Sequence, residues 1–419
     1  VFSWYNIGVK IKSIQQVKSL ANKNVILRVD FNVPVKNGKV VDNYKIKKSL
    51  ATIKFLIEKR AKVILVSHLG RPNGVDKKLS LKPVAAELGR FLQKKVDLLD
   101  VLNLKKAKIQ IDKLFPSEVV MLENIRFAHG ESDNLERLAK ELAGLADIFV
   151  MDGFAVAHRQ AASVTGVAKH LPTYAGLLLE EEIEGLDRAI QSPKKPFVVV
   201  LGGVKMETKI PVLKNLLKKA NYILIGGGIL NTYLWAKGCG VAGSLVDKNF
   251  KKEILRYCSK RKVILPVDVI VGTEKGKLAR ATATKNLNLK NKELAIYDIG
   301  PKTIKLFSHY IKKANTLVWN GAMGYFEQHP YQYGTYSVAR LLAARAKGKA
   351  FGITGGGETV EVLKKLHLIG DIDLASTGGG SMLEYLSGNK LPGIEILKKL
   401  FINFNNLYMP SPTSGNKQD

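Results

Sequence analysis

The sequence predicts an α/β protein built of two doubly wound (Rossmann-like) parallel-sheet domains joined by a hinge helix. The chain has 419 residues, enough for two or three domains with buried cores. Short runs of β-branched apolar residues alternate with segments that have the apolar spacing of helices. The residues that follow these runs are charged or carry amides in the first half of the chain and are glycines in the second half. Regular alternation of this type is typical of parallel sheets, whose strands are buried on both faces.

Ten apolar runs are expected to form the strands. They occupy 24–33, 62–70, 119–127, 148–156, 196–203, 222–228, 263–271, 316–321, 351–357 and 373–380. Between them, Ile46, Leu50, Ile53 and Ile57 are spaced as on one face of a helix. Segments with similar spacing are 81–95, 134–146, 211–220 and 359–368.

The predicted strand ends carry charged and amide side chains in the first half of the chain and glycines in the second. Ligands of open α/β sheets bind at the carboxyl ends of the strands, so two kinds of strand end predict two sheets and two ligands. The segment between the halves reads as a helix closed by Ser-Pro and Lys-Lys-Pro. We therefore expect an N-terminal domain at 1–176, a linker at 177–196, a C-terminal domain at 197–392, and a C-terminal segment at 393–419 that ends in a disordered Pro/Ser/Gly-rich tail.

The composition excludes several classes of protein. Apolar residues make up 46% and charged residues 24%, unlike a disordered chain, a collagen-like fibre or a small disulfide scaffold. There is no long uninterrupted apolar stretch and no evident secretory signal, so we expect no membrane partner. Two cysteines in so long a chain fit a reducing compartment, and we expect a cytoplasmic protein.

The chain is strongly basic, with 66 Lys and Arg against 36 acids and a net charge of +30. This excess favours anionic partners without choosing among them. The lysines are scattered in pairs, such as Lys47-Lys48 and Lys218-Lys219, rather than gathered in blocks. A solvated lysine-rich surface is favoured over a nucleic-acid face, so no specific nucleic-acid partner is predicted. A basic nucleic-acid-binding module remains as a hypothesis from another class, which duplex-DNA binding at physiological salt would test.

The first half supplies a candidate pocket for a small acid. Its strand ends carry Asp30, Asn32, His68, Arg71, Arg126 and Arg159. Arginine captures carboxylate and phosphate in a bidentate manner, while Asp30 and Asn32 can orient a hydroxyl group. Each arginine alone could equally form a surface ion pair, and His68 could be a structural imidazole. Their common position at strand ends favours a binding site for a multiply anionic hydroxy acid.

The second half supplies a candidate phosphate site. Its strand ends carry Gly202-Gly203, Gly226–Gly228, Gly355–Gly357 and Gly378–Gly380, with Lys205 and Lys209 after the first pair. Glycine permits close backbone approach, and helix N-termini attract phosphate. One such triplet would indicate only a tight turn, but several predict a phosphate cradle. Walker A, protein-kinase and dinucleotide-binding motifs are absent from the sequence.

An acid site and a phosphate site on separate domains predict phosphoryl transfer. This chemistry depends on positioning and charge neutralisation more than on covalent catalysis. It also implies a hinge, because the reacting groups must meet where water is excluded.

The motifs together resemble phosphoglycerate kinase. They are RVDFNVP (28–34), SHLGRP (67–72), LEN-x-RF (122–127), AHR (157–159), LGG-x-K (201–205), DIGP (298–301), WNG-x-MG-x-FE (319–327) and STGGG (376–380), in the family's order and spacing over about 15–400. The resemblance implies a monomeric glycolytic enzyme. It would transfer a phosphoryl group reversibly between 1,3-bisphosphoglycerate and MgADP, giving 3-phosphoglycerate and MgATP.

Site residues carried over from the family fall into three groups. Those implied to bind 3-phosphoglycerate are Asp30, Phe31, Asn32, Lys45, His68, Leu69, Gly70, Arg71, Arg126 and Arg159. Those implied to bind nucleotide are Gly203, Lys205, Lys209, Gly227, Gly228, Asn320, Glu327, Gly356, Gly357, Glu358 and Thr359, with Glu358 also holding Mg²⁺. Those implied to be catalytic are Lys45, Lys209 and Arg159.

The sequence departs from the family pattern at several positions. Lys45 stands where the family has Arg, and Glu358 stands where it has Asp. The other departures are Thr208 for Asp, Ala155 for Gly, Ala161 for His and Ala322 for Pro. Lysine keeps the charge of arginine but loses its planar fork. These changes leave open an alternative, a phosphoglycerate-kinase-like protein with impaired catalysis that still binds nucleotide.

Overall fold

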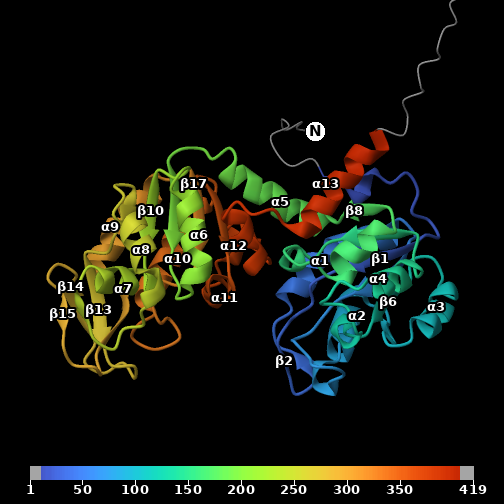
Figure 1. Cartoon of the computed structure of the whole chain (residues 1–419), viewed down its shortest axis with the longest axis horizontal. Helices are drawn as coiled ribbons and strands as arrows, with labels where there is room; N and C mark the ends of the chain where they lie inside the picture. Colours follow the sequence, from blue (N-terminus) through green and yellow to red (C-terminus); the bar gives the residue numbers. More distant parts are fainter. Residues whose placement is uncertain (1–10, 406–419) are drawn as a thin grey trace, which may run out of the picture. The chain divides into compact units, whose positions relative to one another are not determined.

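The computed structural model describes residues 11–405, with side chains up to residue 398 (Figure 1). Within it the chain forms two compact units. One contains residues 11–181 together with the residues from 390 onward, and the other contains residues 182–389. No helix of the described part is long and apolar enough to span a membrane.

The N-terminal unit is built on a six-stranded parallel sheet. In spatial order its strands are β5 (Asp97–Leu99), β6 (Val119–Leu122), β4 (Lys62–Val66), β1 (Asn24–Arg28), β7 (Ile148–Met151) and β8 (Thr173–Ala175). Every neighbouring pair is parallel, so the carboxyl ends of all six strands lie along one edge. A small hairpin follows β1, made of β2 (Val35–Lys36) and β3 (Lys39–Val40).

Helices cover this sheet. They are α1 (Tyr44–Glu58), α2 (Lys82–Leu92), α3 (Leu104–Asp112), α4 (Glu136–Ala143) and α13 (Pro392–Asn405). The apolar stripe predicted around Ile46 and Ile53 lies on α1 and packs with Val84 and Leu88 of α2 against the strands. This burial of one helix face stabilises the layered arrangement.

The chain crosses from one unit to the other within α5 (Leu177–Ile190). The start of this helix is tied to the N-terminal unit by Asp152 and Thr52. Asp152 Oδ1 accepts hydrogen bonds from the Thr52 hydroxyl at 2.9 Å and from the Leu178 N–H at 3.0 Å, and Leu177 N–H donates to Thr52 Oγ1 at 3.0 Å. Burial raises the pKa of Asp152 to about 7, with the hydrogen bonds opposing the shift. The other oxygen, Oδ2, is buried without a partner.

Asp152→Asn is expected to raise the unfolding temperature at pH 8 and to have less effect at pH 5. Because the folded-state pKa is raised, the native state holds the proton more tightly than the unfolded chain, and stability falls as pH rises from about 4 to about 7. Asparagine keeps the acceptor for Thr52 and Leu178 without carrying the charge. Thermal unfolding of both proteins at the two pH values measures this. An equal effect at pH 5 and pH 8 would show that ionisation of Asp152 does not limit stability.

The C-terminal unit is built on a second six-stranded parallel sheet. In spatial order its strands are β12 (Val263–Ile264), β10 (Tyr222–Ile225), β9 (Phe197–Leu201), β17 (Thr316–Asn320), β18 (Phe351–Gly355) and β19 (Leu374–Ser376). Two small sheets accompany it. They are β14 (Arg280–Ala283), β13 (Asp268–Gly272) and β16 (Ala295–Ile299), which are antiparallel, and the pair β11 (Gly240–Val241) and β15 (Asn288–Leu289).

Two groups of helices pack around the second sheet. One group is α9 (Pro301–Lys313), α10 (Tyr333–Ala346) and α11 (Gly357–Lys365). The other is α6 (Met206–Leu216), α7 (Gly227–Ala236), α8 (Lys251–Cys258) and α12 (Gly380–Leu386). Phe307, Val338 and Val362 of the first group pack on Val198, Val200 and Trp319 of the strands. The predicted fold class, with two doubly wound parallel sheets, is confirmed.

Several expected boundaries were wrong. The run 263–271, predicted as one strand, forms β12 and β13 in different sheets. Pro266, which has no N–H to give to a ladder, lies between them. The helix expected at 211–220 begins earlier, at Met206, and includes Pro211.

The expected C-terminal segment begins with a helix that was not predicted from the sequence. A helix, α13, occupies Pro392–Asn405, and its start contacts β8 and the π-helical turn Ala162–Gly166 of the N-terminal unit. Gly393 donates a backbone hydrogen bond to Ala157 at 2.8 Å, and a Cβ at this glycine would lie 2.9 Å from Ala157 Cα. A side chain there would push the helix off the loop that carries Arg159. The expected disordered end of the chain, at 410–419, lies outside the described residues.

Candidate active site

The predicted acid-binding residues lie at the carboxyl edge of the N-terminal sheet. Asp30 follows β1, His68 follows β4, Arg126 lies in the 3-10 turn after β6, and Arg159 follows a similar turn after β7. All four strands are parallel neighbours in the order β6-β4-β1-β7, which brings their following loops together. The sheet topology therefore gathers side chains that are more than 120 positions apart in the sequence.

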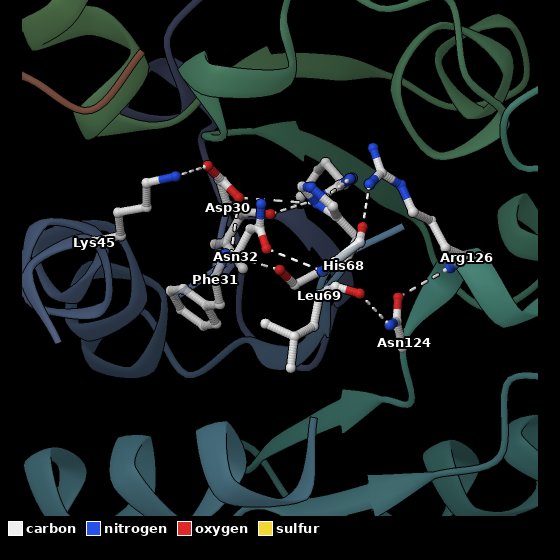
Figure 2. A network of polar contacts seen from close by, with 12 residues as sticks. Asp30, Phe31, Asn32, Lys45, His68, Leu69, Asn124 and Arg126 are labelled. Carbon is white, nitrogen blue, oxygen red and sulfur yellow. Dashed lines mark hydrogen bonds and ion pairs between the residues drawn. The ribbon is translucent and has the colours of Figure 1, made fainter. Parts of the chain in front are cut away.

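Lys45 and Asp30 form the centre of a polar network. Lys45, in the first turn of α1, points toward the Asp30 carboxylate, and its Nζ lies 2.5 Å from Oδ2 (Figure 2). Burial alone would raise the pKa of Asp30, but the charge of Lys45 and hydrogen bonds from Lys45 and the Asn32 N–H outweigh it and hold the pKa below its usual range. Asp30 is therefore an anion that holds Lys45 at the mouth of the site.

The loop that contains Gly70 is held on both sides. Asn32 Oδ1 accepts from the Gly70 N–H at 3.0 Å, and the Arg126 guanidinium donates to the Gly70 carbonyl. Asn124 Nδ2 donates to the Leu69 carbonyl at 2.8 Å (Figure 2). Gly70 has φ +64°, a conformation that favours glycine. These contacts fix the loop between Asn32 and Arg126.

Three arginines line a cavity of about 180 Å³ in this unit. They are Arg28, Arg126 and Arg159, and Ala161 lies in the same wall where the family has a second histidine. Burial and the charges of Arg159, Arg28 and Arg71 together lower the pKa of Arg126 to about 10, with Glu131 acting in the opposite direction. Arginines that depress one another's pKa create a strongly positive field. The arrangement therefore suits an anion with several charged oxygens.

Two predicted contacts cannot act through their side chains. Phe31 is fully buried and Leu69 is nearly so, and both belong to the apolar core. Only their backbone groups are available. The Phe31 N–H already donates to Ser67 Oγ at 2.8 Å, and the Leu69 carbonyl accepts from Asn124.

Arg28 is a site residue that the sequence reasoning missed. It ends β1 and is only 2% exposed, yet it lines the cavity with the predicted arginines. A signal existed, because an arginine that ends an apolar strand two residues before Asp30 is expensive to bury without a purpose.

Glycines of the C-terminal unit stand directly before helices, as predicted. α7 begins at Gly227, α11 follows Gly356, and α12 follows Gly379. Gly227 has φ +58°, and a Cβ there would lie 2.7 Å from the Gly203 nitrogen. These glycines let the turns after β9 and β10 approach closely, and backbone hydrogen bonds from the Gly228 N–H to the Gly203 carbonyl at 3.0 Å and from the Gly203 N–H to the Ala322 carbonyl at 2.8 Å hold them together.

Lys209 is the buried cation of this unit. It is 6% exposed, and its Nζ donates to the Asn320 side-chain oxygen and, at 3.4 Å, to the Asn320 carbonyl. Asn320 in turn donates to the Gly355 carbonyl at 2.5 Å. Burial lowers the pKa of Lys209 to about 8, and Glu358 acts to raise it. The structure thus joins Lys209, Asn320 and the glycine turn before α11.

A cavity of about 320 Å³ lies beside these residues. Five predicted nucleotide contacts are among its walls, namely Gly203, Gly227, Gly228, Glu327 and Glu358. The remaining predicted contacts do not line it. Lys205 is exposed at the start of α6, and the Thr359 hydroxyl donates to the Gly355 and Gly356 carbonyls of its own turn. Burial raises the pKa of Glu327.

The other walls of this cavity were not predicted. Tyr297 and Tyr325 line it, and Tyr297 stacks on Tyr331 with ring centroids 4.6 Å apart. Asp298, from the DIGP motif, also lines it, and burial raises its pKa to about 8. Apolar and aromatic walls with few polar groups suit the flat face of a base. Tyr297 and Asp298 lie in β16 of the small antiparallel sheet, and Tyr325 lies in the loop after β17, so only tertiary pairing brings them to one cavity.

Glu358 fits the role of a magnesium ligand. Its carboxylate is exposed in the first turn of α11, where Oε2 accepts one long hydrogen bond of 3.3 Å from the Ala322 N–H. Mg²⁺ bound with a nucleotide uses one or two carboxylates and takes its other ligands from phosphates and water. No cluster of three or more acidic, histidine or cysteine side chains suited to a metal occurs in residues 11–398. One carboxylate beside a phosphate cradle is therefore the donor set that the chain offers.

Lys209→Met is expected to stabilise the protein at pH 7 by about 1–3 kcal/mol, since each unit of pKa shift corresponds to about 1.4 kcal/mol. The folded-state pKa is lowered to about 8, so below pH 8 the fold carries the full cost of a buried charge, and this cost disappears as pH rises toward 10.5. Thermal unfolding at pH 7 and pH 10 measures the difference between variant and wild type. A difference that grows with pH would contradict the burial of a charged Lys209.

An arginine-lined acid site in one parallel-sheet unit and a glycine-lined site beside a buried lysine in the other are the parts of a two-domain α/β phosphotransferase. The phosphoglycerate kinase family model matches residues 14–389. The phosphoglycerate kinase of Dictyoglomus turgidum is 42% identical over 386 residues, covering 91% of this chain and 97% of that protein. The corresponding enzyme of Pelotomaculum thermopropionicum is 42% identical over 394 residues, covering 92% of this chain and 98% of that protein. The solved phosphoglycerate kinase structure from Coxiella burnetii has a TM-score of 0.82 at 39% identity, covering 93% of this chain and all of that one.

The chain belongs to the phosphoglycerate kinase family. Its activity is reversible phosphoryl transfer between 1,3-bisphosphoglycerate and ADP, giving 3-phosphoglycerate and ATP, with a carboxyl group as acceptor. This is a glycolytic step. The resemblance noted in the sequence is confirmed, and nothing in the comparisons supports the alternative of impaired catalysis.

Proposed function

We propose that the chain binds 3-phosphoglycerate at the strand ends of its N-terminal unit and the nucleotide in the glycine-lined cavity of its C-terminal unit. The observation that supports this proposal is that each unit contains a cavity and that the two cavities differ in size and in the chemistry of their walls. One is small and lined by Arg28, Arg126 and Arg159, and the other is larger and has aromatic and glycine walls.

In the N-terminal unit, the three arginines of the cavity, together with Arg71, bind the charged groups of the acid. Asp30 and Asn32 orient its hydroxyl group. Lys45 is held by Asp30 at 2.5 Å and can turn to a negatively charged group that enters the site. Lys45 replaces the arginine of the family and supplies the same positive charge, but it cannot bind two oxygens in the bidentate geometry of a guanidinium.

In the C-terminal unit, the turn glycines Gly203, Gly227 and Gly356 carry no side chains and let phosphate oxygens approach the backbone closely. Lys209 accompanies the transferred phosphoryl group, and its lowered pKa rises when an anion arrives to pair with it. Glu358 holds Mg²⁺ with the nucleotide phosphates, where the ion supplies charge neutralisation. Asn320 and Glu327 complete the nucleotide contacts, the latter at the ribose.

We further propose that the enzyme acts as a monomer in the cytoplasm and closes its two units by bending near α5. Both cysteines, Cys239 and Cys258, are free thiols, which suits a reducing compartment. Closure is required by the chemistry, because transfer between two separately bound substrates must exclude water.

A coupled assay of ATP consumption with 3-phosphoglycerate and MgATP tests this function. Wild type is expected to turn over at 1–10³ s⁻¹, on the order of the usual enzyme range. The matched variant is Arg159→Gln, which removes charge from the arginine-lined cavity, with exposed Arg137→Gln of the same unit as the control. If Arg159→Gln leaves the KM for 3-phosphoglycerate equal to that of Arg137→Gln, the acid does not bind in this cavity.

A further inference from the structure

A chain of buried hydrogen bonds holds the Arg28 guanidinium in one orientation. Arg28 Nε donates to Ser163 Oγ at 2.8 Å. The Ser163 hydroxyl donates to Glu131 Oε1 at 2.6 Å, and the Ser163 N–H donates to Glu131 Oε2 at 2.9 Å. All three residues are at most 4% exposed. The other side of the guanidinium donates to the carbonyls of Val29 and, at 3.3 Å, Val66.

The remaining nitrogen of Arg28 faces the imidazole of His68. Its Nη2 lies 3.4 Å from His68 Nδ1. An arginine guanidinium only donates hydrogen bonds, so this contact favours the tautomer in which Nδ1 is the acceptor and carries no proton. The competing partner is Asp30 Oδ1, but it lies 3.8 Å from Nδ1, beyond hydrogen-bond distance. That oxygen already accepts from the Asn32 N–H at 3.0 Å.

The second ring nitrogen of His68 faces no protein partner. Nε2 has no hydrogen bond to any residue of the described part of the chain, and it is not among the fully buried polar atoms that lack partners. Burial lowers the pKa of His68 to about 3, with the charges of Arg28, Arg126 and Lys45 acting in the same direction and Asp30 opposing them. The ring is therefore neutral at pH 7, and its single proton must lie on one of the two nitrogens.

We propose that Arg28, Ser163 and Glu131 act as positioning residues that fix the tautomer of His68, so that Nε2–H is presented as a hydrogen-bond donor to an oxygen of the acid substrate. This deepens the proposed function, because it rests on 3-phosphoglycerate binding at these strand ends. His68 then acts as a neutral donor rather than as a cation or a base. The network also explains why a charged group is buried at the end of β1, which the arginine-lined cavity alone does not require.

The tautomer can be read without substrate. In ¹⁵N-histidine-labelled full-length protein at pH 7, the His68 signal is identified as the one lost in His68→Gln. We expect a protonated Nε2 and an unprotonated Nδ1. Arg28→Met removes the donor and is expected to move proton population to Nδ1, toward Asp30. A proton on Nδ1 in wild type would overturn the proposal, as would a folded Arg28→Met protein with an unchanged tautomer.

A second measurement remains informative if Arg28→Met fails to fold. The amide nitrogen of Gln lies near the position of Nε2, and that of Asn lies near the position of Nδ1. Loss of a hydrogen bond to a charged group costs about 1.5–3 kcal/mol. His68→Asn is therefore expected to weaken 3-phosphoglycerate affinity, measured by calorimetry, about tenfold more than His68→Gln. Equal losses, or a smaller loss in His68→Asn, would overturn the donor role of Nε2.

These outcomes separate this proposal from the proposed function. If Nε2 is protonated in the free protein but wild type does not bind 3-phosphoglycerate at the arginine-lined cavity, the tautomer assignment stands, while the donor role and the proposed function fail. If wild type binds the acid there but Nδ1 carries the proton, only the inference drawn from Arg28 fails.

Discussion

Lys209→Met is expected to lower kcat by about 10²–10³-fold, the usual effect of removing one group that stabilises transition-state charge. Lys209 is the one buried lysine among the residues whose side chains the structure describes, and it lies between Asn320 and the turn of Gly203. Its charge is costly in the empty site and becomes favourable when a phosphoryl group arrives. The loss should therefore appear mainly in kcat rather than in the KM for the nucleotide.

Steady-state kinetics in both directions measure this effect. Lys214→Met is the matched control, because Lys214 lies on the same helix, α6, and is exposed. Its kcat should stay within about twofold of wild type, as for a surface substitution. A Lys209→Met enzyme with near-normal kcat and a raised KM for ATP would mean that Lys209 binds the ground state only.

Lys45→Met is expected to reduce kcat by about 10²–10³-fold, while Lys45→Arg retains or increases it. Lys45 is held at 2.5 Å from Asp30, the one carboxylate that faces it in the network of Figure 2. Methionine keeps much of the side-chain volume but removes the charge. Arginine restores the planar fork, which can bind two oxygens at once.

The turnover of wild type compared with that of Lys45→Arg decides whether the lysine at position 45 supports full catalytic activity. Lys47→Met serves as the control, since Lys47 lies on the same helix and contacts the Phe91 ring rather than the network. If wild-type turnover is undetectable and returns in Lys45→Arg, the native protein is not an active kinase. Activity that is indifferent to Met, Lys or Arg at this position would remove Lys45 from the mechanism.

The strands could be predicted where apolar runs are long and end in a change of chemistry. Nine of the ten expected runs contain a single strand of the two large sheets, because strands such as β1 and β9 are buried on both faces and leave a continuous apolar signal. The short strands β5 and β8 were missed, as three residues at a sheet edge carry no period. The small sheets around β13 and β16 were missed because they depend on tertiary pairing.

The site could be predicted where residues follow strands in the sequence. Asp30, His68 and Arg126 fall into this class, since the parallel topology places every carboxyl end on one edge. Arg28 and Tyr297 do not, because their roles depend on what surrounds them after folding. The ion pair between Lys45 and Asp30 could likewise not be predicted from the sequence, since it depends on how the first turn of α1 lies beside the end of β1.

The central claim is that the acid binds to the N-terminal unit and the nucleotide to the C-terminal unit. Calorimetric titration of the Arg126→Gln protein tests it most directly, with 3-phosphoglycerate and MgADP as separate ligands. Arg126 lines the cavity of the N-terminal unit, and the nucleotide cavity is built from residues of the other unit. We predict that the affinity for the acid falls about 10–100-fold, as for a lost hydrogen bond to a charged group, and that the affinity for MgADP is unchanged. An unchanged affinity for the acid, or an equal loss for both ligands, would contradict the account.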